Sequence, residues 1–202
     1  MHATRRSLAL LAALGGLACA PAAHAAADHN VTVSPDALKA DWTGATGSAL
    51  NTSFFLDGTA PGQTGTCAKD PNTMCESTLV HATGDALGGG KLTLRIDGFA
   101  QYSDFDLRAY ESDATGTVGK YLGSPESDNA GTSPLGDSDP RNTAAGDYES
   151  KTVDITGYLD ETGKLDAYFL VEVPYFIVAN DAYQGHATLS DLTPYEPPTD
   201  DE

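Results

Sequence analysis

The chain of 202 residues is poor in basic side chains, with 11 Lys and Arg against 29 Asp and Glu and a formal net charge of −18. A protein that binds nucleic acid or an anionic membrane needs a basic surface to neutralise phosphates. The composition therefore argues against both kinds of partner. Acidity of this size favours solubility and offers many carboxylate oxygens to hard cations such as calcium.

Cysteine is also scarce, with three residues in the whole chain. Cys67 and Cys75 stand in CAKDPNTMC, where the turn sequence from Asp70 to Asn72 brings the two ends together. No further Cys or His lies near enough in the sequence to complete a zinc site with them. Outside the cytoplasm, an even pair at this short spacing predicts a disulfide between Cys67 and Cys75.

Recognisable catalytic motifs are absent from the sequence. There is no G-x-S-x-G elbow and no H-E-x-x-H motif, and His81 and His186 stand in ordinary strand-like runs. Paired acids can hydrolyse glycosides, but no pair is singled out here. We therefore expect a non-catalytic protein and keep a secreted hydrolase with an unrecognised site as the alternative.

Long apolar runs are lacking as well, and the one near the N-terminus, Leu8 to Ala18, is too short for a membrane anchor. It follows Arg5 and Arg6 and precedes a small-x-small cleavage sequence that ends at Ala25. Residues 1–25 are predicted to be a signal peptide of a secreted protein, with export by the Sec or the twin-arginine route both open. Its removal would leave 177 residues, of which nine are basic and 29 acidic, with a net charge of −20.

What the chain does contain is a series of short runs in which apolar and polar residues alternate, the pattern of half-buried strands. The clearest is Lys91 to Tyr110, where two alternating runs are joined by a turn: Leu92/Leu94/Ile96 and Phe105/Leu107/Ala109. Further strands are expected at 30–34, 77–82, 120–122, 148–155, 167–178 and 185–192, with Gly88–Gly90 as a turn. No segment predicts a persuasive helix. The pattern predicts an all-β, antiparallel, jelly-roll-like β-sandwich of about eight to nine strands.

The domain limits follow from the same pass along the chain. We expect a lead-in over 26–39, the sandwich over 40–193 and a disordered acidic tail over 194–202, with a long polar loop at 123–146. Trp42, the only tryptophan, is expected to anchor the core, and a role in stacking on a ligand is the alternative. Six tyrosines are candidates for exposed stacking surfaces or ordinary strand residues: Tyr102, Tyr110, Tyr121, Tyr148, Tyr175 and Tyr183.

Asp104 and Asp106 are the sharpest candidates for a site, because residues i and i+2 of a strand point to the same face. Calcium takes six to eight oxygen ligands, so these two carboxylates would supply part of a set that Glu111, Asp113 and Asp181 could complete. The spacing does not match an EF-hand loop. The alternative is that Asp104 caps the turn and Asp106 pairs with Arg108 or Lys151. Calcium is accordingly the one cofactor that we expect.

Several stretches together resemble the bacterial pre-peptidase C-terminal domain family, over roughly residues 40–192. They are Trp42-Thr43-Gly44, Cys67 with Cys75-Glu76, Lys91 to Leu94, Ser103 to Leu107, Tyr168 to Val173 and Tyr183-Gln184-Gly185. The resemblance implies a jelly-roll β-sandwich of the kind found in secreted proteins, some of which bind calcium, collagen or polysaccharide. The expected function is thus a secreted, non-catalytic binding or stability module with an extracellular polysaccharide or protein as partner.

Overall fold

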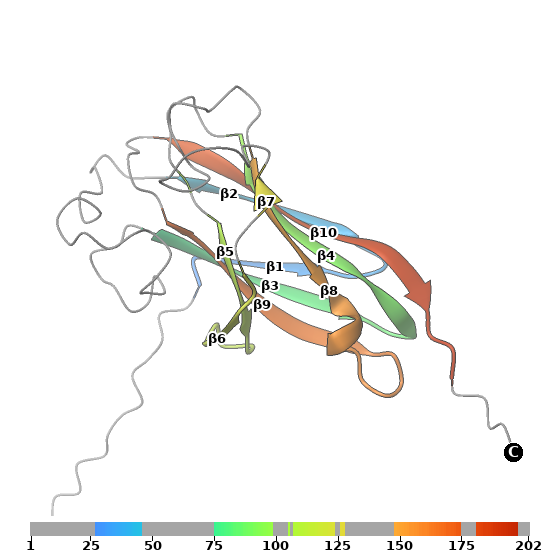
Figure 1. Ribbon diagram of the computed structural model, residues 1–202. Coiled ribbons are helices and arrows are strands. Elements are labelled where there is room, and N and C mark those ends of the chain that lie inside the picture. Colours follow the sequence, from blue (N-terminus) through green and yellow to red (C-terminus); the bar gives the residue numbers. More distant parts are fainter. Residues whose placement is uncertain are drawn as a thin grey trace, which may run out of the picture.

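Two stacked β-sheets form the molecule in the computed structural model, which describes residues 27–45, 75–98, 105, 107–123, 126–127, 148–174 and 181–197 (Figure 1). The first sheet has the strand order β1-β3-β9-β5-β6 and the second β2-β10-β4-β8-β7. The strands are β1 (His29–Val33), β2 (Lys39–Ala45), β3 (Cys75–Gly84), β4 (Leu87–Asp97), β5 (Arg108–Ser112), β6 (Val118–Tyr121), β7 (Glu126–Ser127), β8 (Tyr148–Asp154), β9 (Leu165–Pro174) and β10 (Ala182–Pro194). A single turn of 3-10 helix, η1 (Ile155–Tyr158), is the one helical element in these ranges.

The predicted jelly-roll-like β-sandwich is confirmed. From β1 to β5 the chain crosses to the other sheet at every step, and the last two strands insert between earlier ones. β9 lies between β3 and β5, and β10 lies between β2 and β4. All pairings between these strands are antiparallel except that of β1 with β3, which is parallel. Nine of the ten strands have four residues or more, and β7 has two.

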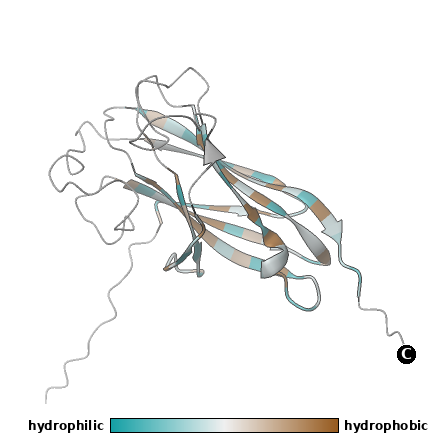
Figure 2. Cartoon of the chain, in the orientation of Figure 1, coloured by the Kyte–Doolittle hydropathy of each residue, from teal (hydrophilic) through white to brown (hydrophobic). Residues whose placement is uncertain are grey.

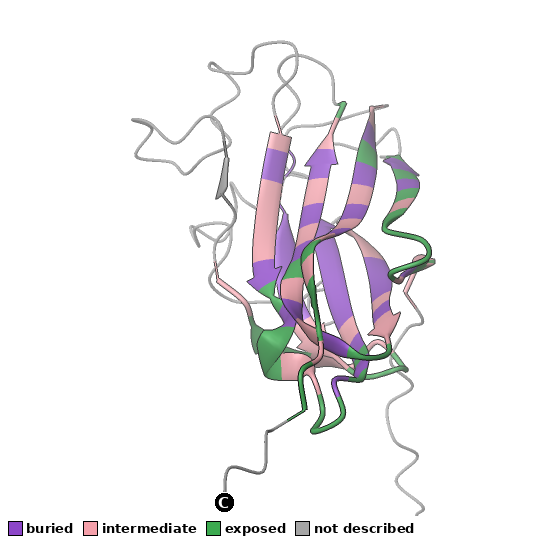
Figure 3. Ribbon diagram, turned by 90° about the vertical axis from the view of Figure 1, so that its right-hand side faces the viewer, coloured by how far each residue is buried: buried purple, intermediate pink, exposed green. Residues whose placement is uncertain are grey.

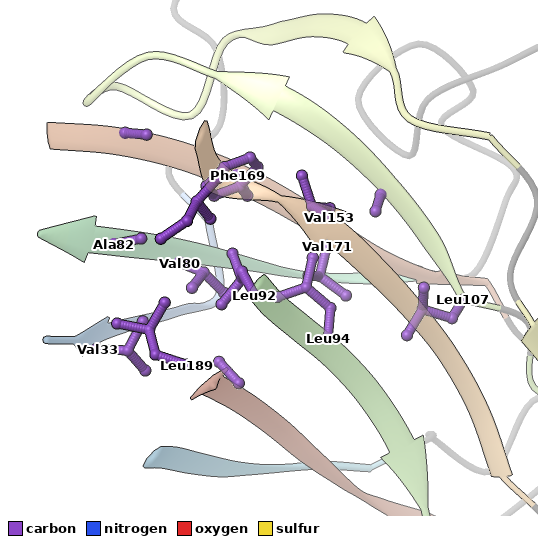
Figure 4. Close-up of a cluster of buried hydrophobic side chains, with 14 of the residues drawn as sticks. Val33, Val80, Ala82, Leu92, Leu94, Leu107, Val153, Phe169, Val171 and Leu189 are labelled. Carbon is purple, nitrogen blue, oxygen red and sulfur yellow. The ribbon is translucent and has the colours of Figure 1, made fainter. Parts of the chain in front are cut away.

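The core lies between the sheets and is built by the alternation seen in the sequence. The side chains of Leu92, Leu94 and Ile96 are fully buried, as are those of Phe105, Leu107 and Ala109 to within 2%. Figure 4 shows part of this cluster, with Leu94 and Val171 converging from opposite sheets. Brown and teal bands alternate along the strands in Figure 2, and buried and more exposed bands alternate in Figure 3. The two runs of the Lys91–Tyr110 stretch do not pair; β4 and β5 belong to different sheets.

Trp42 is a core residue, as predicted, with 6% of its surface exposed. It lies directly opposite Gly185 in the β2–β10 pair, and its indole crosses that glycine so closely that a Cβ there would lie 2.0 Å from the ring. Two residues further along the same strands, the Tyr183 ring crosses Gly44 in the same way. Burial raises the pKa of the Tyr183 hydroxyl far above its ordinary value, and the charge of Glu76 adds to this effect.

Several predicted boundaries differ from the observed ones. Gly88–Gly90 belong to β4 and not to a turn. A glycine is needed at position 88 because the backbone carbonyl of Pro194 lies where a Cβ would be. The turn lies directly before β4, where Ala86 has a φ of 55°. β9 is a central strand whose described part ends at Pro174, and residues 175–180 of the expected strand lie outside the described residues.

The sandwich also takes in residues on both sides of its predicted limits. β1 lies in the expected lead-in and forms the edge of the first sheet. β10 continues to Pro194, and Tyr195 donates hydrogen bonds to the backbone oxygens of Ala86 and Glu161. The predicted signal peptide, most of the 123–146 loop and residues 198–202 lie outside the described residues. In the described part of the chain, no helix is long and apolar enough to cross a membrane.

Candidate functional site

The carboxylates expected to bind calcium are only partly within the described residues. Asp104 and Asp106 lie outside them, whereas Glu111, Asp113 and Asp181 lie within. Oδ1 of Asp113 accepts hydrogen bonds from N of Thr115 at 2.8 Å, Oγ1 of Thr115 at 2.6 Å and N of Thr117 at 3.1 Å. These bonds hold the pKa of Asp113 down at about 2. This oxygen is therefore already committed to the β5–β6 turn.

The same turn occurs a second time, before β9. Oδ1 of Asp160 accepts from N and Oγ1 of Thr162 and from N of Lys164, at 2.7–3.0 Å. Both turns have the sequence D-x-T-G, and their glycines, Gly116 and Gly163, have φ values of 81° and 74°. The repetition assigns Asp113 a structural role, which the D-x-T-G pattern could have signalled.

The other two described acids are likewise engaged and lie apart. Glu111 accepts a hydrogen bond at 2.9 Å from the Tyr158 hydroxyl, whose pKa burial and this carboxylate raise to about 12. Asp181 accepts from N of Ala182 at the start of β10. Asp113 and Asp181 are also far from each other. Asp113 lies six residues of extended chain beyond Leu107, ~20 Å along β5. Asp181 lies near the start of that segment, because Phe105 contacts Tyr183, two residues beyond Asp181. Among the described residues, no group of three His, Cys, Asp or Glu could hold a metal ion.

Only one of the two cysteines of the predicted disulfide lies within the described residues. Cys75 is the first residue of β3, and Cys67 lies outside the described residues. The pairing of the two stays a prediction.

The outer face of the second sheet, here the polar face, carries a network of charged and aromatic side chains across four strands. Nδ1 of His186 on β10 lies 2.6 Å from Asp41 on β2, and its Nε2 lies 3.2 Å from Asp97 on β4. Arg95 pairs with Asp97 at 2.7 Å and lies 3.9 Å over the ring of Tyr148 on β8. Each of these groups thus has a partner on the same face, which stabilises the sheet and leaves few groups to bind a ligand.

The outer face of the first sheet, here the aromatic face, is different in character. Residues that lie directly opposite each other in neighbouring strands share a face, and two such rows cross β3, β9, β5 and β6. One row contains His81, Tyr168, Ser112 and Val118, and the next contains Leu79, Leu170, Tyr110 and Tyr121. Two pairs of aromatic rings therefore stand on adjacent strands.

The first ring pair is held in a defined geometry. The rings of His81 and Tyr168 are stacked, with centroids 4.2 Å apart and planes within 4°. Nε2 of His81 donates to Oδ1 of Asp166 at 2.8 Å, which fixes the imidazole. The His81 and Asp166 side chains are 27% and 54% exposed, so this part of the face is accessible to solvent.

The second ring pair is Tyr110 with Tyr121, whose centroids are 5.3 Å apart. Tyr121 is 43% exposed, whereas Tyr110 is buried, which raises its pKa to about 12. Burial also increases along β9 on this face, from Asp166 through Tyr168 to Leu170 and Glu172, the last two only 4% and 1% exposed. The accessible region of the aromatic face therefore comprises His81, Asp166, Tyr168, Ser112 and Tyr121.

Three of the six candidate tyrosines can be assigned to one of the two expected roles, an exposed surface or an ordinary strand residue. Tyr183 is 1% exposed and Tyr110 9%, because the first faces the core and the second a covered part of its sheet, while Tyr121 is exposed as expected. Tyr148 lies partly exposed on the polar face, and Tyr102 and Tyr175 lie outside the described residues. Tyr168 was missed, although its alternation with Ala167 and Phe169 places it on the outer face.

Neither the family models nor the curated proteins nor the solved structures contain a match to this chain.

Proposed function

We propose that the protein is a secreted, non-catalytic binding module that uses the aromatic face to hold an extracellular polysaccharide or protein. The observation that carries the proposal is the stacked pair of His81 and Tyr168, fixed by Asp166 on a solvent-accessible sheet. Rigid aromatic side chains provide contact area at small entropic cost, which suits a binding surface. The resemblance to the pre-peptidase C-terminal domain family supports the same role.

The polar face provides the contrast that favours this choice. Its Asp41, His186, Asp97 and Arg95 are bonded to one another, so a ligand would have to break existing ion pairs. On the aromatic face, Tyr121 and Tyr168 offer apolar surface without such a cost.

A retention assay with the purified protein tests this function. The protein should be retained on insoluble polysaccharide or collagen, and products of hydrolysis should not form. Replacement of Tyr168 by Ala should weaken retention, whereas Tyr148→Ala, the matched change on the polar face, should not. Hydrolysis of a substrate from a glycosidase or peptidase panel would favour the alternative, a secreted hydrolase.

Calcium dependence is a further part of the proposal, supported by Asp104 and Asp106 and by the acidity of the chain. A calcium ion that binds only the folded state raises its melting temperature by mass action. The protein should therefore melt at a higher temperature in calcium than in chelator, and Asp104→Asn with Asp106→Asn should remove the difference. Identical melts of the unaltered protein in both buffers would contradict calcium binding.

A further inference from the structure

The ring of Tyr168 on the aromatic face has different neighbours on its two sides. Its plane is parallel to that of His81, 4.2 Å away on the neighbouring strand β3, so His81 covers one face of the phenol. On the other side the directly opposite residue is Ser112 of β5. Serine is small, and its hydroxyl is turned to its own strand end, where it donates to the backbone oxygen of Thr117 at 2.9 Å.

The small side chain of Ser112 thus lies between two larger ones in its row, Tyr168 on β9 and Val118 on β6, and the surface above Ser112 is here named the slot. The Tyr110–Tyr121 pair lies beyond Ser112 as seen from Tyr168, in the neighbouring row of paired residues on β5 and β6. Tyr168 and Tyr121 are separated by two strand spacings across the sheet and by about two residues along the strands, which places their Cα atoms ~12 Å apart. Two linked sugar rings have about this length, so one ring could lie against Tyr168 while the next reaches Tyr121.

The charges on the face restrict the class of ligand. Arg108, which lies opposite Glu172 on this face, is 8% exposed, whereas Asp166 is accessible. With a net charge of −18 for the whole chain, an anionic polymer would be repelled. A neutral ring with apolar faces and hydroxyl groups at its rim fits both the aromatic walls and the polar atoms of Asp166 and Ser112.

We infer that the slot between Tyr168, Ser112 and Tyr121 binds a pyranose unit of a neutral polysaccharide, with His81 and Asp166 as positioning residues that hold the Tyr168 ring upright. The inference rests on the proposed binding function and narrows its ligand to one chemical class. The positioning residues act through Tyr168, so their loss should loosen the ring and weaken binding less than loss of the ring itself.

Affinity measurements on cellulose and chitin, on an anionic polysaccharide and on collagen test the inference. Tyr168→Ala should weaken binding to a neutral polysaccharide about tenfold, as expected when one aromatic stack is lost. Ser112→Ile, which fills the slot without a flat face and suits a strand, should do the same. Asp166→Asn should have a smaller effect, and Tyr148→Ala on the polar face should have none. The emission of Trp42, the only tryptophan, verifies that each variant is folded.

The outcomes separate the two proposals. Binding to collagen alone, with dependence on Tyr168, would overturn the polysaccharide inference and leave the binding function in place. Binding to neutral polysaccharide that survives both Tyr168→Ala and Ser112→Ile would overturn the slot. Preference for the anionic polymer would overturn the charge argument, and binding to none of the polymers would overturn both proposals.

Discussion

At the scale of single residues, the aspartates of this chain show that acidity alone does not identify a ligand site. Asp113 and Asp160 each bind the backbone of their own D-x-T-G turn, and Asp154 similarly accepts from N of Thr156 at the start of η1. Their local hydrogen bonds lower the pKa of all three carboxyls. These bonds need the ionised oxygen and therefore link the turns to pH.

The depressed pKa values predict a loss of stability in acid. Asp113 has a pKa of about 2 in the folded state against an ordinary value of 3.8, so its contribution is complete above pH ~5. It is lost as the pH falls toward 2. The double variant Asp113→Asn, Asp160→Asn keeps oxygen acceptors but cannot titrate. Urea unfolding from pH 5 to pH 2 should show a shallower fall in the free energy of unfolding for this variant, and equal slopes would contradict the assignment.

The sequence could predict individual buried residues because the signal is local. The alternation of Leu92, Leu94 and Ile96 identifies the core face of β4, and burial of Trp42 follows from its size and apolar surface. The sequence left open whether Tyr183 is an exposed tyrosine or an ordinary strand residue, because alternation alone does not say which face of a strand is the inner one.

At the scale of elements, the connection between the two sheets just before β5 depends on a buried acid. Glu149 on β8 is 4% exposed and accepts a hydrogen bond from N of Leu107, in the segment that leads to β5. β8 pairs with β4 in the second sheet, whereas β5 belongs to the first sheet. The side chain thus links the sheets across the core.

Removal of this carboxylate should be costly. Glu149→Ala leaves the amide of Leu107 unpaired in the interior, which should lower the free energy of unfolding by about 1–3 kcal/mol. Glu149→Gln keeps an acceptor oxygen and should lose less. Glu161→Ala, at an exposed glutamate, is the control and should change little. Equal losses in the Ala variants of Glu149 and Glu161, measured by urea unfolding, would exclude this role.

The sequence could not predict which strands pair with each other, and the reason is physical. β10 enters between β2 and β4, and β9 between β3 and β5, so partners far apart in the chain meet. Such pairing depends on the whole fold and not on local preference. The same limit applies to the aromatic face: His81 and Tyr168 stack across two strands separated by much of the chain, and no local pattern joins them.

At the scale of the whole molecule, the two outer faces differ in character, and we propose that one of them binds a ligand. The polar face is held together by contacts between side chains of four strands, such as those of His186 with Asp41 and Asp97, while the aromatic face presents Tyr168 and Tyr121 to solvent. In the proposed function, the acidity of the chain favours solubility while an apolar surface is exposed. The fold class followed from the sequence, and the difference between its faces required the structure.

The central claim is that the aromatic face is the binding surface, and chemical-shift mapping of an isotope-labelled sample tests it most directly. Titration with a soluble neutral oligosaccharide should shift the amide signals of Tyr168, Ser112 and Tyr121, while those of Arg95 and His186 on the polar face stay in place. Shifts confined to the polar face, or no shifts on either face at saturating ligand, would contradict the account.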